Sequence, residues 1–178
     1  MRNPRDNDWL PRLDNSFYQG HAVVFWTFVV HNRASDWLNP LFHAQFREIL
    51  LHTYVRYQQM CAAYVLMPDH VHLMMLGLRP EADQRRAISF LRTFIKPTPH
   101  EWQHQPHDHV LREEERVRGA FQSIVHYLLQ NPVRKNLVTH IDEWPHTGCM
   151  LPGYPKLHPT EPGYWDKFWT AYWNARNA

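Results

Sequence analysis

Two apolar runs with almost nothing between them constrain the fold of this chain more than any other feature. Residues 61–67 (CAAYVLM) and 70–78 (HVHLMMLGL) each have the length and composition of a buried strand, and only Pro68 and Asp69 separate them. A connection of two residues joins antiparallel neighbours, because a parallel pair needs a long crossover. The sequence therefore predicts a β-hairpin inside an antiparallel sheet.

The segments around this hairpin predict helices that pack on the sheet. A buried central strand is expected at residues 21–30 (HAVVFWTFVV), and a short strand is a further candidate at 109–112. Apolar residues recur at helical spacing in four segments, 40–50, 84–95, 113–131 and 165–173. Pro97 and Pro132 end the second and third of these predicted helices. This order of strands and helices indicates an α+β domain with an antiparallel sheet.

The overall composition narrows the class of protein. The 178 residues suffice for one domain with a real core. No apolar stretch reaches the roughly 18 residues of a membrane span, and the start of the chain lacks the apolar segment of a secretory signal. Two cysteines cannot form a disulfide framework. A cytoplasmic protein is therefore expected, with no membrane as partner.

Histidine and arginine are unusually frequent among the polar residues. The chain has 14 histidines, which supply neutral metal ligands and acid–base groups near pH 7. Arginines outnumber lysines by 15 to 4, and the planar guanidinium suits phosphate. Since the net charge is only +2, any phosphate-binding surface must be a local patch.

Two histidines begin the second strand of the hairpin. His70 and His72 are two residues apart, so in a strand both imidazoles project from one face and could hold one divalent metal ion. Alone the pattern is weak, because the chain is rich in histidine and His107 and His109 repeat it. The pair follows a tight turn and lies in an otherwise apolar strand, where a buried polar side chain needs a hydrogen-bonding or metal partner.

A tyrosine and an asparagine share one side of the predicted helix 113–131. At about 100° per residue, Tyr127 and Asn131 both lie beside the apolar stripe, one turn apart. A tyrosine there is usually a boundary residue with a buried ring and a solvated hydroxyl. The functional interpretation makes the phenol a nucleophile and the Asn131 amide oxygen a third ligand to a metal held by His70 and His72.

Together, three segments resemble the REP-associated tyrosine transposases, which are single-tyrosine HUH nucleases (HUH stands for His-hydrophobic-His). The segments are 64–75 (YVLMPDHVHLMM), 107–112 (HDHVLR) and 127–134 (YLLQNPVR), the last followed by Leu137 and Val138. They occur in the order and spacing of that family, and the resemblance covers residues 17–140.

The resemblance implies a ferredoxin-like HUH fold and the cleavage and rejoining of single-stranded DNA near a hairpin or palindromic repeat. It implies that His70 and His72 bind a divalent metal, Mg²⁺ or Mn²⁺, with Asn131 as the third ligand. Tyr127 becomes the nucleophile, which forms a 5′-phosphotyrosine intermediate. The segment 107–112 matches the family but receives no catalytic role.

Binding to single-stranded or hairpin DNA requires cations that follow the backbone and flat side chains that stack on bases. Candidate cations occur in the second predicted helix and after the helix that carries Tyr127. They are Arg85, Arg86, Arg92, Lys96, Arg134 and Lys135. Solvated surface charge is the simpler interpretation of each one. A DNA-binding protein of this kind is expected to be associated with the nucleoid. The sequence is compatible with either a monomer or a homodimer.

Three functions compete for this sequence. The first is an active transposase-like nuclease, the second a domesticated protein that binds repeated palindromic DNA without turnover, and the third an unrelated histidine-rich metal-binding protein. The intact set of His70, His72, Tyr127 and Asn131 favours the first.

We expect three segments along the chain: an N-terminal arm at 1–19, a catalytic domain at 20–141 and an aromatic-rich C-terminal extension at 142–178.

Overall fold

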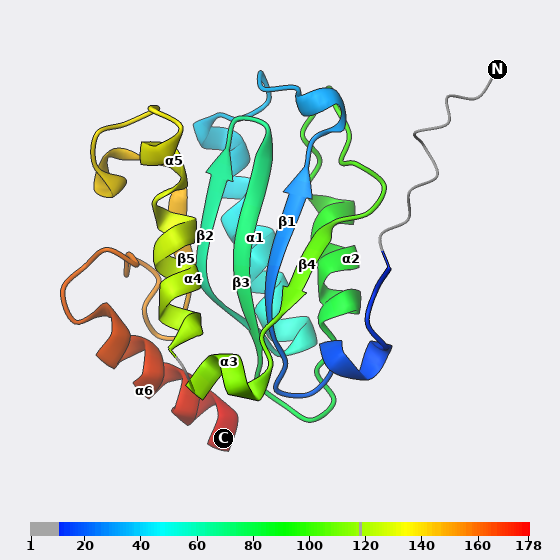
Figure 1. Ribbon diagram of the computed structural model, residues 1–178, viewed down its shortest axis with the longest axis vertical. Coiled ribbons are helices and arrows are strands. Elements are labelled where there is room, and N and C mark those ends of the chain that lie inside the picture. Colours follow the sequence, from blue (N-terminus) through cyan, green and yellow to red (C-terminus); the bar gives the residue numbers. More distant parts are fainter. Residues whose placement is uncertain (1–10, 118) are drawn as a thin grey trace.

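A five-stranded antiparallel sheet forms the centre of the part of the chain that the computed structural model describes, residues 11–117 and 119–178 (Figure 1). Its order is β4-β1-β3-β2-β5. The strands are β1 Val23–Val29, β2 Gln59–Met67, β3 His70–Gly77, β4 His107–Val110 and β5 Thr147–Met150. The helices are α1 Pro40–Tyr57, α2 Gln84–Phe94, α3 Glu113–Val117, α4 Ala120–Leu129, α5 Asn131–Arg134 and α6 Tyr164–Asn177. Short 3₁₀ turns are η2 Asn15–Tyr18, η3 His31–Arg33 and η4 Ile141–Glu143.

The predicted hairpin is confirmed, and it lies near the middle of the sheet. β2 and β3 pair from Gln59↔Gly77 to Met67↔His70, and β1 pairs with the other side of β3. The succession β1–α1–β2–β3–α2–β4 is the ferredoxin-like arrangement. The predicted α+β class is therefore confirmed.

Helices cover both faces of the sheet, because the side chains of each strand alternate between the faces. On β3, Val71 and Leu73 point into the core beneath α1 and α2. Met74 and Leu76 point into a second core, beneath α4 and α6. Figure 1 shows α1 behind the sheet and α4 in front of it. His70 and His72 have the same alternation as Met74 and so belong to the α4 side.

The predicted helix 113–131 is wrong as a single helix. α3 ends at Val117, and α4 begins at Ala120 after Gly119, whose φ of +76° lies in the left-handed region that favours glycine. A further short helix, α5, then starts at Asn131. The apolar periodicity runs through this interruption, which is why the pattern suggested one helix.

The C-terminal residues add a strand and a helix to the same sheet and core. β5, which the sequence analysis did not predict, pairs with β2 through Tyr64↔Gly148 and Val65↔Thr147. The predicted aromatic helix is confirmed as α6, and its Tyr164 and Phe168 are buried in the α4-side core. How far residues 1–19, 20–141 and 142–178 differ in function stays a prediction, and residues 1–10 of the arm lie outside the described part. Within the described part, no helix combines the length and the apolar character needed to cross a membrane.

Candidate functional site

The two predicted histidines face each other where β3 leaves the hairpin turn. Their Nε2 atoms are 3.0 Å apart and their ring centroids 4.5 Å apart. His70 is paired in register with Val29, and His72 with Thr27. His70 is 7% exposed, and the His72 ring stacks on Phe25 at a centroid distance of 5.1 Å. The sheet thus holds the two imidazoles as a preformed pair, as the spacing predicted.

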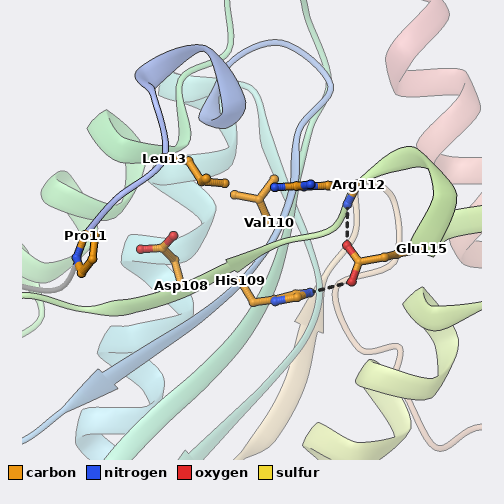
Figure 2. Close-up of a pocket in the computed structure, with 7 residues that line it drawn as sticks. All are labelled: Pro11, Leu13, Asp108, His109, Val110, Arg112 and Glu115. Atoms are coloured by element: carbon orange, nitrogen blue, oxygen red, sulfur yellow. Dashed lines mark hydrogen bonds and ion pairs between the residues drawn. The ribbon is translucent and has the colours of Figure 1, made fainter.

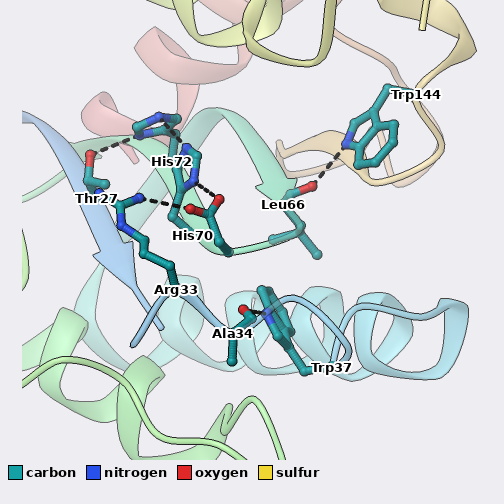
Figure 3. A network of polar contacts seen from close by, with 9 residues as sticks. Thr27, Arg33, Ala34, Trp37, Leu66, His70, His72 and Trp144 are labelled. Atoms are coloured by element: carbon teal, nitrogen blue, oxygen red, sulfur yellow. Dashed lines mark hydrogen bonds and ion pairs between the residues drawn. The ribbon is translucent and has the colours of Figure 1, made fainter. Parts of the chain in front are cut away.

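Each imidazole has a polar partner on its other nitrogen, Nδ1 (Figure 3). The carboxylate of Asp69 lies 2.6 Å from Nδ1 of His70, and the hydroxyl of Thr27 lies 2.8 Å from Nδ1 of His72. The other oxygen of Asp69 accepts a hydrogen bond from Arg33 at 3.0 Å. An ionised carboxylate can only accept, so Nδ1 of His70 carries the proton and Nε2 presents its lone pair.

The hydroxyl of Thr27 can donate or accept, and this choice sets the tautomer of His72. When it donates to Nδ1, Nε2–H of His72 can donate to Nε2 of His70 across the 3.0 Å contact. When it accepts from Nδ1–H, both Nε2 lone pairs face the same point. The two imidazoles can therefore form either a hydrogen-bonded pair or a two-nitrogen ligand set.

Burial keeps both rings in the neutral form that binds metals. Burial and, to a smaller extent, the neighbouring His70 lower the pKa of His72 to about 3. Burial also lowers the pKa of His70, although the hydrogen bond and the charge of Asp69 oppose this shift. For Asp69 itself, burial raises the pKa, but contacts with His70 and Arg33 outweigh that effect and leave it lowered. Asp69 is therefore ionised near neutral pH.

Asn131 is buried at the junction of α4 and α5, with 7% of its surface exposed. Its amide nitrogen Nδ2 donates to the backbone carbonyls of Tyr127 at 3.2 Å and Leu128 at 3.1 Å. The amide oxygen is then the atom that can serve as a ligand. α5 contacts β2, the strand that pairs with β3.

Tyr127 lies on α4 with 48% of its surface exposed. The guanidinium of Arg134 lies 4.4 Å from the centroid of its ring, within the range of a cation–π interaction. The break between α4 and α5 therefore leaves a basic side chain on the predicted nucleophile. The phenol remains accessible to a large substrate such as DNA.

The donor set fits a divalent metal ion. Two ligand atoms at right angles and about 2.1 Å from one ion are about 3 Å apart, which is the separation of the two Nε2 atoms. Within residues 11–117 and 119–178, no cluster of three or more His, Cys, Asp or Glu side chains is arranged to hold a metal. The amide oxygen of Asn131 as a third ligand at this pair stays a prediction from the sequence.

The predicted DNA-binding cations are divided between the two faces of the sheet. Arg134 ends α5 and Lys135 follows it, and Arg134 contacts Tyr127 of α4, the helix that covers the histidine side of the sheet. The other four belong to α2 or follow it, on the opposite side; they are Arg85, Arg86, Arg92 and Lys96. Arg92 is engaged within the fold, because its guanidinium donates to the carbonyls of Gln103 and His104.

The segment 107–112 forms the open edge of the sheet. Residues of β4 and the following loop line a surface cavity of about 470 Å³ together with Pro11 and Leu13 (Figure 2). Glu115 accepts a hydrogen bond from the backbone N–H of Arg112 at 2.8 Å and lies 3.0 Å from Nε2 of His109. β1 lies between β4 and β3, and His109 is paired in register with Phe25, whose ring stacks on His72.

Sequence reasoning missed the groups that support the histidines. Asp69 was interpreted only as a turn residue, and Thr27 and Arg33 were not considered. Thr27 carried a usable signal, because it is the only hydroxyl-bearing residue in the apolar run 22–30. Arg33 carried none, since its loop is brought to Asp69 only by the tertiary fold.

The sheet and the histidine pair define the class of protein: an α+β protein of ferredoxin-like arrangement that carries two facing histidines on its central strand. No family model matches the chain. It is 25% identical over 161 residues to a protein of Haemophilus influenzae provisionally named a REP-associated tyrosine transposase, and the match covers 80% of this chain and 88% of that protein.

A solved structure supports the same class at the level of the fold. It is a REP-associated tyrosine transposase bound to a REP hairpin, with a TM-score of 0.64 and 20% identity. The similarity covers 79% of this chain and 81% of that one. The resemblance to the REP-associated tyrosine transposases that the motifs indicated is confirmed.

Proposed function

We propose that this protein is a transposase-like enzyme that cleaves and rejoins single-stranded DNA at hairpins or palindromic repeats, with a divalent metal ion and a 5′-phosphotyrosine intermediate. One observation carries the proposal. The facing Nε2 atoms of His70 and His72 lie on the face of the sheet that α4 covers, and α4 carries Tyr127. The similarity to transposases supports the same reaction class.

Tyr127 is the nucleophile in this proposal. Its phenolic oxygen attacks the phosphorus of the scissile phosphodiester, the bond from phosphorus to the 3′ oxygen breaks, and the 5′ phosphate remains on the tyrosine. The phenol loses its proton and the leaving 3′ oxygen gains one, so a free 3′-OH results. The phosphotyrosine ester retains the energy of the cleaved bond, and a later 3′-OH can reverse the step without a nucleotide cofactor.

The other residues prepare the site for an anionic substrate. His70 and His72, with the Asn131 amide oxygen, would hold Mg²⁺ or Mn²⁺, and a bound ion would neutralise and orient the phosphate. Arg134 and Lys135 add positive charge on the same side, and Arg134 contacts the Tyr127 ring.

The proposed substrate is a hairpin with a single-stranded flank. The similar solved transposase is bound to a REP hairpin, and this chain covers most of its length. A net charge of +2 favours a local contact with a structured strand over general binding to duplex. We therefore expect tighter binding to such a hairpin than to plain duplex of equal length, compared across a salt series.

A covalent adduct is the decisive test. The protein is incubated with Mn²⁺ and hairpin strands taken from repeats beside its own coding region, and the products are separated by denaturing electrophoresis. Mass spectrometry should locate the DNA on Tyr127 through a 5′ phosphate. Tyr127→Phe removes one exposed oxygen, so it should abolish the adduct and leave DNA affinity within about threefold.

Each other outcome selects a different function. Cleavage without an adduct would mean that water is the nucleophile, and an adduct on another tyrosine, such as Tyr64 or Tyr154, would refute the site. Hairpin binding without cleavage or adduct would favour a non-catalytic binder of palindromic DNA.

A further inference from the structure

The carboxylate of Asp69 uses its two oxygens for two different partners. Oδ1 lies 2.6 Å from Nδ1 of His70, and Oδ2 accepts from Nη1 of Arg33 at 3.0 Å (Figure 3). The backbone of Asp69 is also fixed, because its carbonyl accepts a hydrogen bond from the N–H of Val30 at 3.0 Å. The turn of the hairpin is therefore tied to the end of β1, and the carboxylate has one defined position.

The backbone that places Arg33 beside this carboxylate has positive φ angles. Asn32 and Arg33 both have a φ of +56°, a region that residues other than glycine seldom adopt. The backbone N–H of His31 donates to the carbonyl of Glu101 at 2.7 Å, which anchors the loop. Local strain of this kind persists where the surrounding structure demands it, often at functional sites.

The contact with Asp69 leaves hydrogen-bond donors of the Arg33 guanidinium available. Its side chain is 59% exposed, and a guanidinium has five N–H donors, of which one is used here. The remaining donors form a planar fork suited to a phosphate group. The guanidinium is close to the histidine pair, because the Asp69 carboxylate contacts both Arg33 and His70.

On the basis of the proposed function, we propose that Asp69 is a positioning residue with two duties: it orients His70 as a metal ligand, and it holds Arg33 as a contact for a DNA phosphate beside that metal. The carboxylate accepts a hydrogen bond from Nδ1–H of His70, which fixes the tautomer of that ring and makes its Nε2 a better metal ligand. Accepting from Arg33 directs the unused donors of the guanidinium away from the protein. One carboxylate thus aligns the two groups that would meet the substrate.

A purely structural ion pair would behave differently. An exposed pair of this kind contributes little to folding stability and has no reason to change metal affinity. The proposal instead predicts separable effects, on Mn²⁺ affinity through His70 and on DNA affinity through Arg33. The test measures both, with the melting temperature as a check on folding.

Metal affinity is measured first, by calorimetric titration of the DNA-free protein with Mn²⁺. Asp69→Asn keeps the shape but weakens the acceptor, so we expect roughly 10- to 100-fold weaker binding, the range found for partners of metal-binding histidines. His72→Ala, which removes a proposed ligand, sets the upper limit of the loss. Arg33→Ala should stay within about twofold of wild type. If Asp69→Asn does not fold, Asp69→Glu, which displaces the carboxylate, takes its place.

DNA affinity is measured second, with a hairpin strand in EDTA and at several salt concentrations. Arg33→Ala should weaken binding and reduce the slope of log affinity against log salt by about one, as expected for the loss of one phosphate contact. Arg33→Lys, which keeps the charge, should restore the slope but not the full affinity. Arg56→Ala is the matched control, because Arg56 is an exposed arginine on α1, on the other side of the sheet.

The outcomes separate this inference from the proposed function. Wild-type affinity for Mn²⁺ in Asp69→Asn, or an unchanged salt slope in Arg33→Ala, overturns the inference even when the wild-type protein forms the Tyr127 adduct. A wild-type protein that binds no Mn²⁺ overturns both the inference and the metal-dependent function. The expected losses of Mn²⁺ affinity in Asp69→Asn and of salt slope in Arg33→Ala support the inference even when the wild-type protein forms no adduct on Tyr127.

Discussion

At the scale of single residues, a second group of histidines lies on the opposite side of the sheet from His70 and His72. Nε2 of His43 lies 2.9 Å from the hydroxyl oxygen of Tyr64, and Nη1 of Arg47 donates to that oxygen at 3.1 Å. The Tyr64 proton is therefore directed to His43, which must be neutral to accept it. Burial lowers the pKa of His43 to about 4, with smaller contributions from positive charge on His146, Arg47 and His158.

This depressed pKa predicts a loss of stability in weak acid. Below its ordinary pKa of 6.5, His43 binds a proton in the unfolded chain but not in the folded protein until the pH approaches 4. The unfolded state therefore binds more protons in that window, and the free energy of unfolding decreases as the pH falls through it.

Urea unfolding at pH 7 and pH 4.5 measures this contribution. The loss of stability between the two pH values should be smaller in His43→Gln than in wild type, because the titrating group is gone. His52→Gln, an exposed histidine on the same helix, is the control and should lose as much as wild type. An equal loss in His43→Gln would show that other groups account for the acid sensitivity.

At the scale of elements, β5 depends on a close approach between two strands. A Cβ atom at Gly148 would lie 2.4 Å from the hydroxyl oxygen of Tyr64 and 3.1 Å from Nη1 of Arg47. Tyr64 is fully buried and held by hydrogen bonds, so it has little freedom to move away. Glycine is thus required for β5 to pair with β2.

Gly148→Ala should therefore destabilise the protein. Overpacking in a rigid site costs about 1–3 kcal/mol, which corresponds to a fall of several degrees in melting temperature, at about 2–4 °C per kcal/mol for a chain of this size. Calorimetry or circular dichroism would measure it. Ser89→Ala, at an exposed position of α2, should change the melting temperature by less than 2 °C, about the effect of 0.5 kcal/mol. A Gly148→Ala protein as stable as wild type would mean that β5 can shift without cost.

At the scale of the whole molecule, the sheet separates the basic side chains into two groups on opposite faces. Arg134 and Lys135 lie on the side of the histidines, whereas Arg85 and Arg86 lie on α2. DNA that reaches Tyr127 must approach the first group. DNA binding should therefore depend on the basic side chains of one face of the sheet.

Paired substitutions decide which face binds DNA. Arg134→Ala with Lys135→Ala should weaken binding of a hairpin strand and reduce its salt slope by about two, because two phosphate contacts are lost. Arg85→Ala with Arg86→Ala removes the same charge from the opposite face and should leave the slope near the wild-type value. The reverse result would mean that the hairpin lies across α2, away from the histidine pair.

The sequence was most informative where structure depends on local spacing. The two-residue connection determined the hairpin, and the separation of two residues determined that His70 and His72 share a face. The apolar periodicity predicted α1, α2 and α6. It placed the end of α2 within one residue, but α1 continues seven residues and α6 four residues beyond the predicted segments. It failed at Gly119, because a periodic stripe can continue across a backbone break.

What only the tertiary structure decided were contacts between distant segments. Thr27 meets His72 because β1 pairs with β3, and Arg33 meets Asp69 because a loop after β1 lies beside the hairpin turn. β5 is four residues long and contains a glycine, so its pairing follows from the shape of the Tyr64 site and leaves no local pattern. Spacing along the chain determines which side chains share a face, because backbone geometry repeats every few residues. The partner that supports each side chain is set by long-range packing, and such packing has no period in the sequence.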